Sequence, residues 1–79
     1  MDINTEFCRT LLNSVMEEVR QHTTPEQRKK VWVYHFDRDN YEFHGPNDFY
    51  WNGRADNKTH ARAQGWMAYL RHIGVEGWK

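Results

Sequence analysis

The sequence predicts an α+β domain: a three-stranded antiparallel sheet flanked by an N-terminal and a C-terminal helix, in the order α, short α, β, β, β, α. Residues 31–51 are rich in aromatic and β-branched residues and are broken by two groups of turn-forming residues, which is typical of a strand meander. The segments on either side place apolar residues three and four positions apart, which indicates helices. All 79 residues, 1–79, are expected to form one domain.

The N-terminal segment is predicted to form an amphipathic helix from about Thr5 to Gln21. Its apolar positions are Phe7, Cys8, Leu11, Leu12, Val15, Met16 and Val19. A short second helix is expected to follow as far as Lys30, because Thr24 and Gln27 form a capping-box pattern around Pro25. This short helix would direct the chain into the sheet.

The register of the first two strands depends on the loop between them. The strands are expected at residues 31–36, 41–44 and 49–51. A four-residue loop at 37–40 would place Phe36 opposite Tyr41. The core face of the sheet would then consist of Trp32, Tyr34, Phe36, Tyr41 and Phe43.

The third strand can present either of its faces to the core. Its register depends on the length of the loop at 45–48, because a one-residue slip exchanges Tyr50 for Phe49 and Trp51. In either register, at least one large aromatic residue of this strand is expected on the less covered face of the sheet.

The C-terminal segment is predicted to be the second major helix, beginning near Lys58. The dipeptide Asn52-Gly53 predicts a tight turn before it, and Asp56 or Asn57 is a suitable N-cap. The residues expected to be buried between helices and sheet are Leu12, Val15, Trp66 and Leu70.

Two glycines in this segment predict local features of the helix. Gly65 lowers helix stability by roughly 1 kcal/mol relative to alanine, so its position predicts close packing against the first helix or a sheet aromatic. Gly74 is expected at the C′ position that ends the helix. Trp78, beyond it, can fold back if it finds an apolar slot.

The charge of the chain argues against a broad surface for binding phosphates. The net charge is zero and the pI is about 7.0. Residues 1–27 hold five acidic and two basic residues, a net charge of −3, and residues 28–79 hold nine basic and six acidic residues, a net charge of +3. A local basic surface in the second part is therefore compatible with the neutral total.

The single cysteine and the hydropathy pattern bear on the compartment. Cys8 has no partner for an internal disulfide, which fits a reducing compartment, and the sequence shows neither a membrane span nor a signal peptide. We therefore expect a cytoplasmic protein with no membrane association.

The sequence predicts no catalytic residue, no metal site and no cofactor. The five histidines never fall at the i, i+4 spacing of a helical zinc pair. His35 and His44, on adjacent strands, could face each other, but no third ligand accompanies them. The aspartates lie in predicted turns, where they favour the turn itself. The chain is accordingly expected not to be an enzyme.

The leading functional hypothesis is a small protein-binding module that modulates or inhibits a larger intracellular protein, as accessory proteins of phages and mobile elements do. Aromatic residues and arginine dominate the energetics of protein interfaces. The predicted partner-binding residues are Tyr50, Trp51, Arg54, Lys58 and Arg62. A homodimer formed through the same aromatic residues is a further option, since it would supplement a small core.

The alternative hypothesis is a nucleic-acid-binding domain, with exposed aromatics stacking on bases and Arg54, Lys58 and Arg62 contacting phosphates. The helix opening at residues 57–62 resembles the last helix of double-stranded-RNA-binding domains. The strand end at residues 50–53 resembles that of three-stranded DNA-binding domains of the AP2 and integrase arm-binding types. The distance from Gly45 to the predicted C-terminal helix is too short for the two strands that lie between them in the first family. The second family lacks the long acidic N-terminal helix of this chain, so no residue role is carried over from either family.

Overall fold

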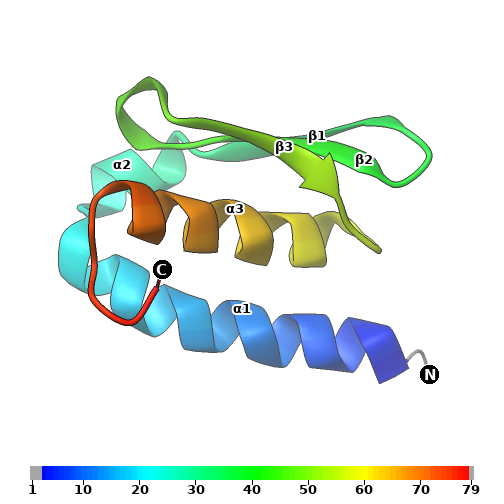
Figure 1. Ribbon diagram of the computed structural model, residues 1–79, viewed down its shortest axis with the longest axis horizontal. Coiled ribbons are helices and arrows are strands. Elements are labelled where there is room, and N and C mark those ends of the chain that lie inside the picture. The colour runs from blue at the N-terminus through cyan, green and yellow to red at the C-terminus, as the bar shows by residue number, and fades with distance from the viewer. Residues whose placement is uncertain (1–2, 79) are drawn as a thin grey trace.

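The computed structural model describes residues 3–78 and has the predicted α+β architecture (Figure 1). Its elements are α1 (Ile3–His22), α2 (Pro25–Lys29), β1 (Trp32–Asp37), β2 (Asn40–His44), the 3-10 turn η1 (Pro46–Asp48), β3 (Tyr50–Arg54) and α3 (Lys58–His72). The strands form an antiparallel sheet in the order β1-β2-β3. The predicted order of helices and strands is confirmed.

Helix α3 forms the middle layer of the molecule, between the sheet and α1 (Figure 1). It contacts all three strands on one side and α1 on the other. The expectation that both long helices pack on the sheet is therefore correct for α3 only. The reason lies in the composition of α3, whose buried residues are Ala61, Ala63, Gly65, Trp66, Tyr69 and Leu70. A helix with apolar residues on two sides becomes buried between two layers.

The core is built mainly from α1, α3 and the middle strand β2. Val15, Trp66 and Leu70 are buried as predicted, and Leu12 is half-buried at the margin of the same cluster. The C-terminal Trp78 is also partly buried against this cluster, so the tail after α3 folds back on the core.

The contact between α3 and the sheet is closest at Gly65. A Cβ atom at this position would lie only 2.1 Å from Cγ of Phe43 on β2, far inside the normal contact distance. Because glycine has no side chain, α3 can lie directly on the Phe43 ring. The predicted close approach is confirmed, and the sheet aromatic is the neighbour.

Capping residues set the ends of the shorter segments as the sequence predicts. The Thr24 N–H donates to Oε1 of Gln27 at 2.8 Å, and the Gln27 N–H donates to the Thr24 hydroxyl at 3.2 Å. At the start of α3, Oδ1 of Asn57 accepts a hydrogen bond from the His60 N–H at 2.8 Å. Gly74 follows the C-cap of α3 with φ of +80°.

The pairing of β1 with β2 contains an irregularity that was not predicted, and this irregularity exchanges the faces of β1. Asp37 pairs with Asn40 around a two-residue turn, which by itself would keep the predicted register, but the register shifts by one residue between His35 and Asp37. Val33 then lies opposite Phe43, where the prediction placed Tyr34. Successive residues of a strand point to opposite faces, so this change of register moves a whole set of side chains. The expected core face was correct for the buried Tyr41 and Phe43 and wrong for the exposed Trp32, Tyr34 and Phe36.

The third strand extends further than predicted. Asn52 and Gly53 were expected to form a tight turn, but both lie within β3, where Gly53 pairs with Tyr41. The Trp51 ring covers Gly53, and its Cζ2 atom lies 2.6 Å from where a Cβ of Gly53 would be. The turn preference of the dipeptide is overridden because pairing with β2 supplies the backbone hydrogen bonds and the Trp51 ring fills the space at the glycine.

Candidate binding surface

No other described element covers the outer face of the sheet, opposite α3 (Figure 1). Aromatic side chains line this face. We call this surface the aromatic face and define it by Trp32, Tyr34 and Phe36 on β1, Glu42 and His44 on β2, and Tyr50 on β3. The exposed fractions of Trp32, Tyr34, Phe36 and Tyr50 are 49%, 51%, 49% and 46%. Contiguous exposed rings of this kind are unusual on an isolated domain and mark interaction surfaces.

The rings of the aromatic face contact one another in two rows. Along β1, the centroid of the Tyr34 ring lies 6.4 Å from that of Trp32 and 6.4 Å from that of Phe36. Across the strands, Trp32 stacks on His44 with a centroid distance of 3.8 Å and an interplanar angle of 4°. His44 in turn meets the edge of Tyr50 at 5.2 Å. These contacts hold the rings in place and leave their outer surfaces open to a ligand.

The carboxylate of Glu42 lies among these rings and contacts two of them. The Tyr50 hydroxyl donates a hydrogen bond to Oε2 of Glu42 at 2.9 Å, and Nε2 of His44 lies 3.1 Å from Oε1. Hydrogen bonding with His44, and then with Tyr50, lowers the pKa of the Glu42 carboxyl below its ordinary value of 4.5. The aromatic face therefore carries a negative charge at neutral pH.

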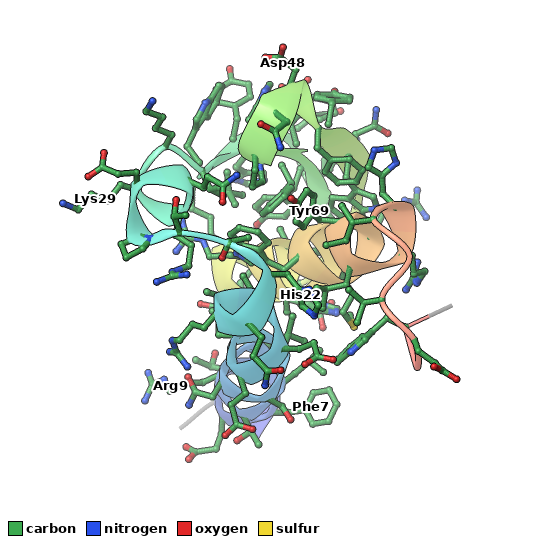
Figure 2. All side chains as sticks on the ribbon, turned by 90° about the vertical axis from the view of Figure 1, so that its left-hand side faces the viewer. Phe7, Arg9, His22, Lys29, Asp48 and Tyr69 are labelled. Carbon is green, nitrogen blue, oxygen red and sulfur yellow. The ribbon has the colours of Figure 1, made fainter. Side chains whose placement is uncertain are left out.

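A cavity of about 470 Å³ adjoins the aromatic face where α2 approaches the η1 turn. Its lining includes Glu26 and Gln27 of α2, Asp48 and Phe49 of the η1 region, and Trp32 and His44, which also belong to the aromatic face. Figure 2 shows the molecule from this end and labels Lys29 on α2 and Asp48 on η1. Because two residues are shared, the cavity and the aromatic face form one continuous surface.

The η1 turn that forms one wall of the cavity has an uncommon backbone. Asn47 and Asp48 both have positive φ angles, 54° and 64°, a region that residues other than glycine rarely adopt. The Gly45 N–H donates to the Phe49 carbonyl at 2.7 Å, and the Phe49 N–H donates to the Pro46 carbonyl at 3.0 Å. These bonds close the turn and compensate for its strain. Strained turns held by their surroundings are frequent at binding sites.

The predicted partner-binding residues do not lie together. Tyr50 is on the aromatic face, as expected for one aromatic of its strand. Trp51 points the other way, is half-buried and packs against the core. Adjacent residues of a strand cannot share a face, so the prediction that both form one binding surface is wrong for Trp51.

The basic residues of the predicted site are also separated from the aromatic face. Lys58 and Arg62 are exposed, but they belong to α3 and so lie on the opposite side of the sheet. Arg54 ends β3 at the far end from the cavity, and its Nε lies 3.7 Å from Oδ2 of Asp39 in an exposed ion pair. The structure therefore does not bring the predicted basic residues to the exposed rings.

Sequence reasoning missed Trp32, Tyr34 and Phe36 as surface residues, because it placed them in the core. The period-two pattern does group these rings on one face of β1, but it does not say which face is covered. The faces of β1 are set by the register shift between His35 and Asp37, which places Val33 opposite Phe43, and the sequence gives no clear signal for this shift.

The geometry offers no assembled metal site within residues 3–78. No group of three histidine, cysteine or acidic side chains in this range is placed to hold a metal ion. His44 lies on the aromatic face, whereas His35 stacks on Tyr41 of the core face at a centroid distance of 4.4 Å. The two histidines that could have faced each other are thus on opposite faces. Cys8 is buried, with the Asn57 side-chain amide 4.0 Å from its sulfur.

None of the helices within residues 3–78 combines the length and the apolar composition that crossing a membrane requires. Comparisons of the chain with protein-family models, with curated proteins and with solved structures find no match.

Proposed function

We propose that this chain is a non-enzymatic module that binds a larger protein through the aromatic face and thereby modulates its activity. The observation that carries the proposal is the row of half-exposed rings of Trp32, Tyr34 and Phe36, which continues through His44 to Tyr50. Rings that are already fixed by their neighbours lose little conformational entropy on binding, and buried aromatics are the usual anchors of protein interfaces.

The distribution of charge favours a protein partner over nucleic acid. Bases could stack on the same rings, but the phosphates would then need cations nearby. Glu42 instead places a carboxylate on the aromatic face, and Lys58 and Arg62 lie on the other side of the sheet. We therefore expect negligible binding to generic DNA or RNA at about 150 mM salt, a concentration that screens exposed charges.

The proposal is tested by affinity capture from a nuclease-treated lysate, followed by titration of the captured protein against purified variants. Tyr34→Thr and Phe36→Thr each remove one exposed ring and keep a residue that favours strands. Each substitution is expected to weaken the complex by roughly tenfold or more, the size typical of an interface hot spot.

A matched control uses another exposed aromatic away from the aromatic face. Phe7 is 64% exposed on α1, at the opposite side of the molecule from Asp48 in Figure 2. Phe7→Ala should leave binding unchanged. Equal loss of binding for Phe7→Ala and Tyr34→Thr would contradict the proposal, and so would tight nucleic-acid binding that falls steeply with salt.

A further inference from the structure

We propose that the aromatic face and its cavity bind an extended, arginine-bearing segment of the partner protein. This inference rests on the proposed function and adds the chemistry of the segment that is recognised. It follows from three features of the surface: its length, the spacing of its rings and the sign of its charge.

The shape of the surface requires an elongated occupant. The cavity beside α2 opens onto the aromatic face through Trp32 and His44, and the rings then continue along β1 to Phe36. Successive rings along β1 have centroids 6.4 Å apart. Side chains two residues apart on an extended strand are separated by about 6.5–7 Å. Alternate side chains of an extended segment would therefore meet successive rings.

The charge of the surface selects a cationic segment. Glu42 presents its carboxylate on the aromatic face, and Glu26 and Asp48 line the cavity. Neither Glu26 nor Asp48 forms an ion pair with another residue of the described chain. Lys30 is the single lysine or arginine among the residues that line the cavity. The two carboxylates outnumber the one ammonium group in this lining, so an anionic segment would meet net repulsion, whereas a cationic segment could pair with Glu26 and Asp48.

Arginine suits this surface better than lysine. A guanidinium group is planar, stacks on aromatic rings and binds a carboxylate through two parallel hydrogen bonds. The stacked rings of Trp32 and His44, at an interplanar angle of 4°, lie on the boundary between the cavity and the carboxylate of Glu42. An arginine lying on this pair could reach the Glu42 carboxylate on one side and the acidic lining of the cavity on the other. The compact ammonium group of lysine provides neither the plane nor the paired donors.

The test uses a capped five-residue peptide in which arginine alternates with valine, titrated into isotopically labelled protein and followed by the backbone amide signals. We expect saturable shifts at Trp32, Tyr34 and His44. A peptide with lysine in place of arginine should bind several-fold more weakly, and one with glutamine at least tenfold more weakly. Equal affinity for the arginine and glutamine peptides would overturn the inference.

A matched pair of variants locates the contact. Glu42→Gln keeps the shape of the side chain and its hydrogen-bonding oxygen, and it should weaken the binding of the arginine peptide by about tenfold while the circular dichroism spectrum stays unchanged. Glu17→Gln, on the exposed surface of α1, should leave the affinity unchanged. Equal affinity of the wild type and Glu42→Gln for the arginine peptide would overturn the inference.

The two proposals fail in different ways. If Tyr34→Thr abolishes the captured complex but the arginine peptide does not bind, the aromatic face is an interface and the arginine inference is wrong. If the captured complex survives both Tyr34→Thr and Phe36→Thr, the proposed function is wrong and the inference falls with it. Displacement of the captured protein by the arginine peptide, and not by the glutamine peptide, would support both.

Discussion

Replacing Gly65 with alanine should destabilise the domain, although alanine is the better helix former. In an open helix the substitution would favour folding by about 1 kcal/mol. Here the new Cβ would lie 2.1 Å from Cγ, 2.3 Å from Cδ2 and 2.6 Å from Cβ of Phe43. These atoms are the base of the ring and not a flexible end, so rotation of the side chain cannot relieve the overlap.

The size of the effect follows from how far α3 and β2 would have to separate. Nonbonded carbons rest about 3.5–4.0 Å apart, so relief requires a shift of more than about 1 Å. Phe43 is fully buried and packs edge-to-face on Trp66 at 5.3 Å, so the shift would loosen the centre of the core. Overpacking of this kind costs about 3 kcal/mol or more. After the gain in helix propensity, we expect a net loss of about 2 kcal/mol, a large share of the roughly 4–12 kcal/mol typical of a chain this long.

Urea denaturation, followed by tryptophan fluorescence and circular dichroism, measures this loss. Phe43→Ala removes the two atoms nearest to the new Cβ, so Gly65→Ala should be at least about 1 kcal/mol less destabilising in that background. Gly74→Ala is the control, because φ is +80° there but a Cβ would meet nothing within 4 Å. Its effect should be the same in both backgrounds. Unchanged or increased stability of Gly65→Ala would refute the close contact between α3 and β2.

Four further outcomes follow from the same structure. Leu70→Ala should lower the free energy of unfolding by roughly 2–5 kcal/mol in urea, and a loss under about 1 kcal/mol would mean that α3 is not central to the core. Trp51→Ala should lower the melting temperature whereas Tyr34→Thr should barely change it, because only Trp51 packs against the core; similar melting shifts would contradict the assigned faces. Because the pKa of Glu42 is lowered, its ionised carboxylate contributes stability that is complete above pH 4.5 and is lost as pH falls through that lowered value. In Glu42→Gln, the free energy of unfolding should therefore depend less on pH below 4.5. An unchanged pH dependence would count against the contact with His44 and Tyr50. Addition of a chelator should leave the melting temperature of the purified protein unchanged, and elemental analysis showing stoichiometric zinc would contradict this expectation.

The helices were predictable because their signals are local. The capping box at Thr24, the N-cap at Asn57 and the C′ position of Gly74 each depend on residues within about one turn, and each is confirmed. The layering was not predictable in the same way. The position of α1, against the sheet or against α3, depends on which residues of α3 are buried on each of its two sides. Contacts between distant segments determine this burial.

The candidate surface was only partly predictable for a related reason. Helical spacing correctly placed Lys58 and Arg62 on exposed positions of α3, but it said nothing of where α3 lies relative to Tyr50. The faces of β1 depended on the register shift between His35 and Asp37. A two-residue turn and a four-residue loop at residues 37–40 would both place Tyr34 opposite Phe43, so the turn residues alone could not indicate which face of β1 is covered.

The packing of α3 on Phe43 explains why the three rings of β1 face outward. Contact at Gly65 brings α3 so close to the sheet that a helix Cβ would not fit over the ring. In that narrow gap β1 contributes the small side chain of Val33, which is buried opposite Phe43. The alternative register would place Trp32, Tyr34 and Phe36 in the same gap and would force the layers apart. The core therefore accounts for the absence of these rings from the interior, but it does not account for their being aromatic. Polar residues would serve an exposed strand face equally well for folding, so the three adjacent rings are the feature on which the proposed interface depends.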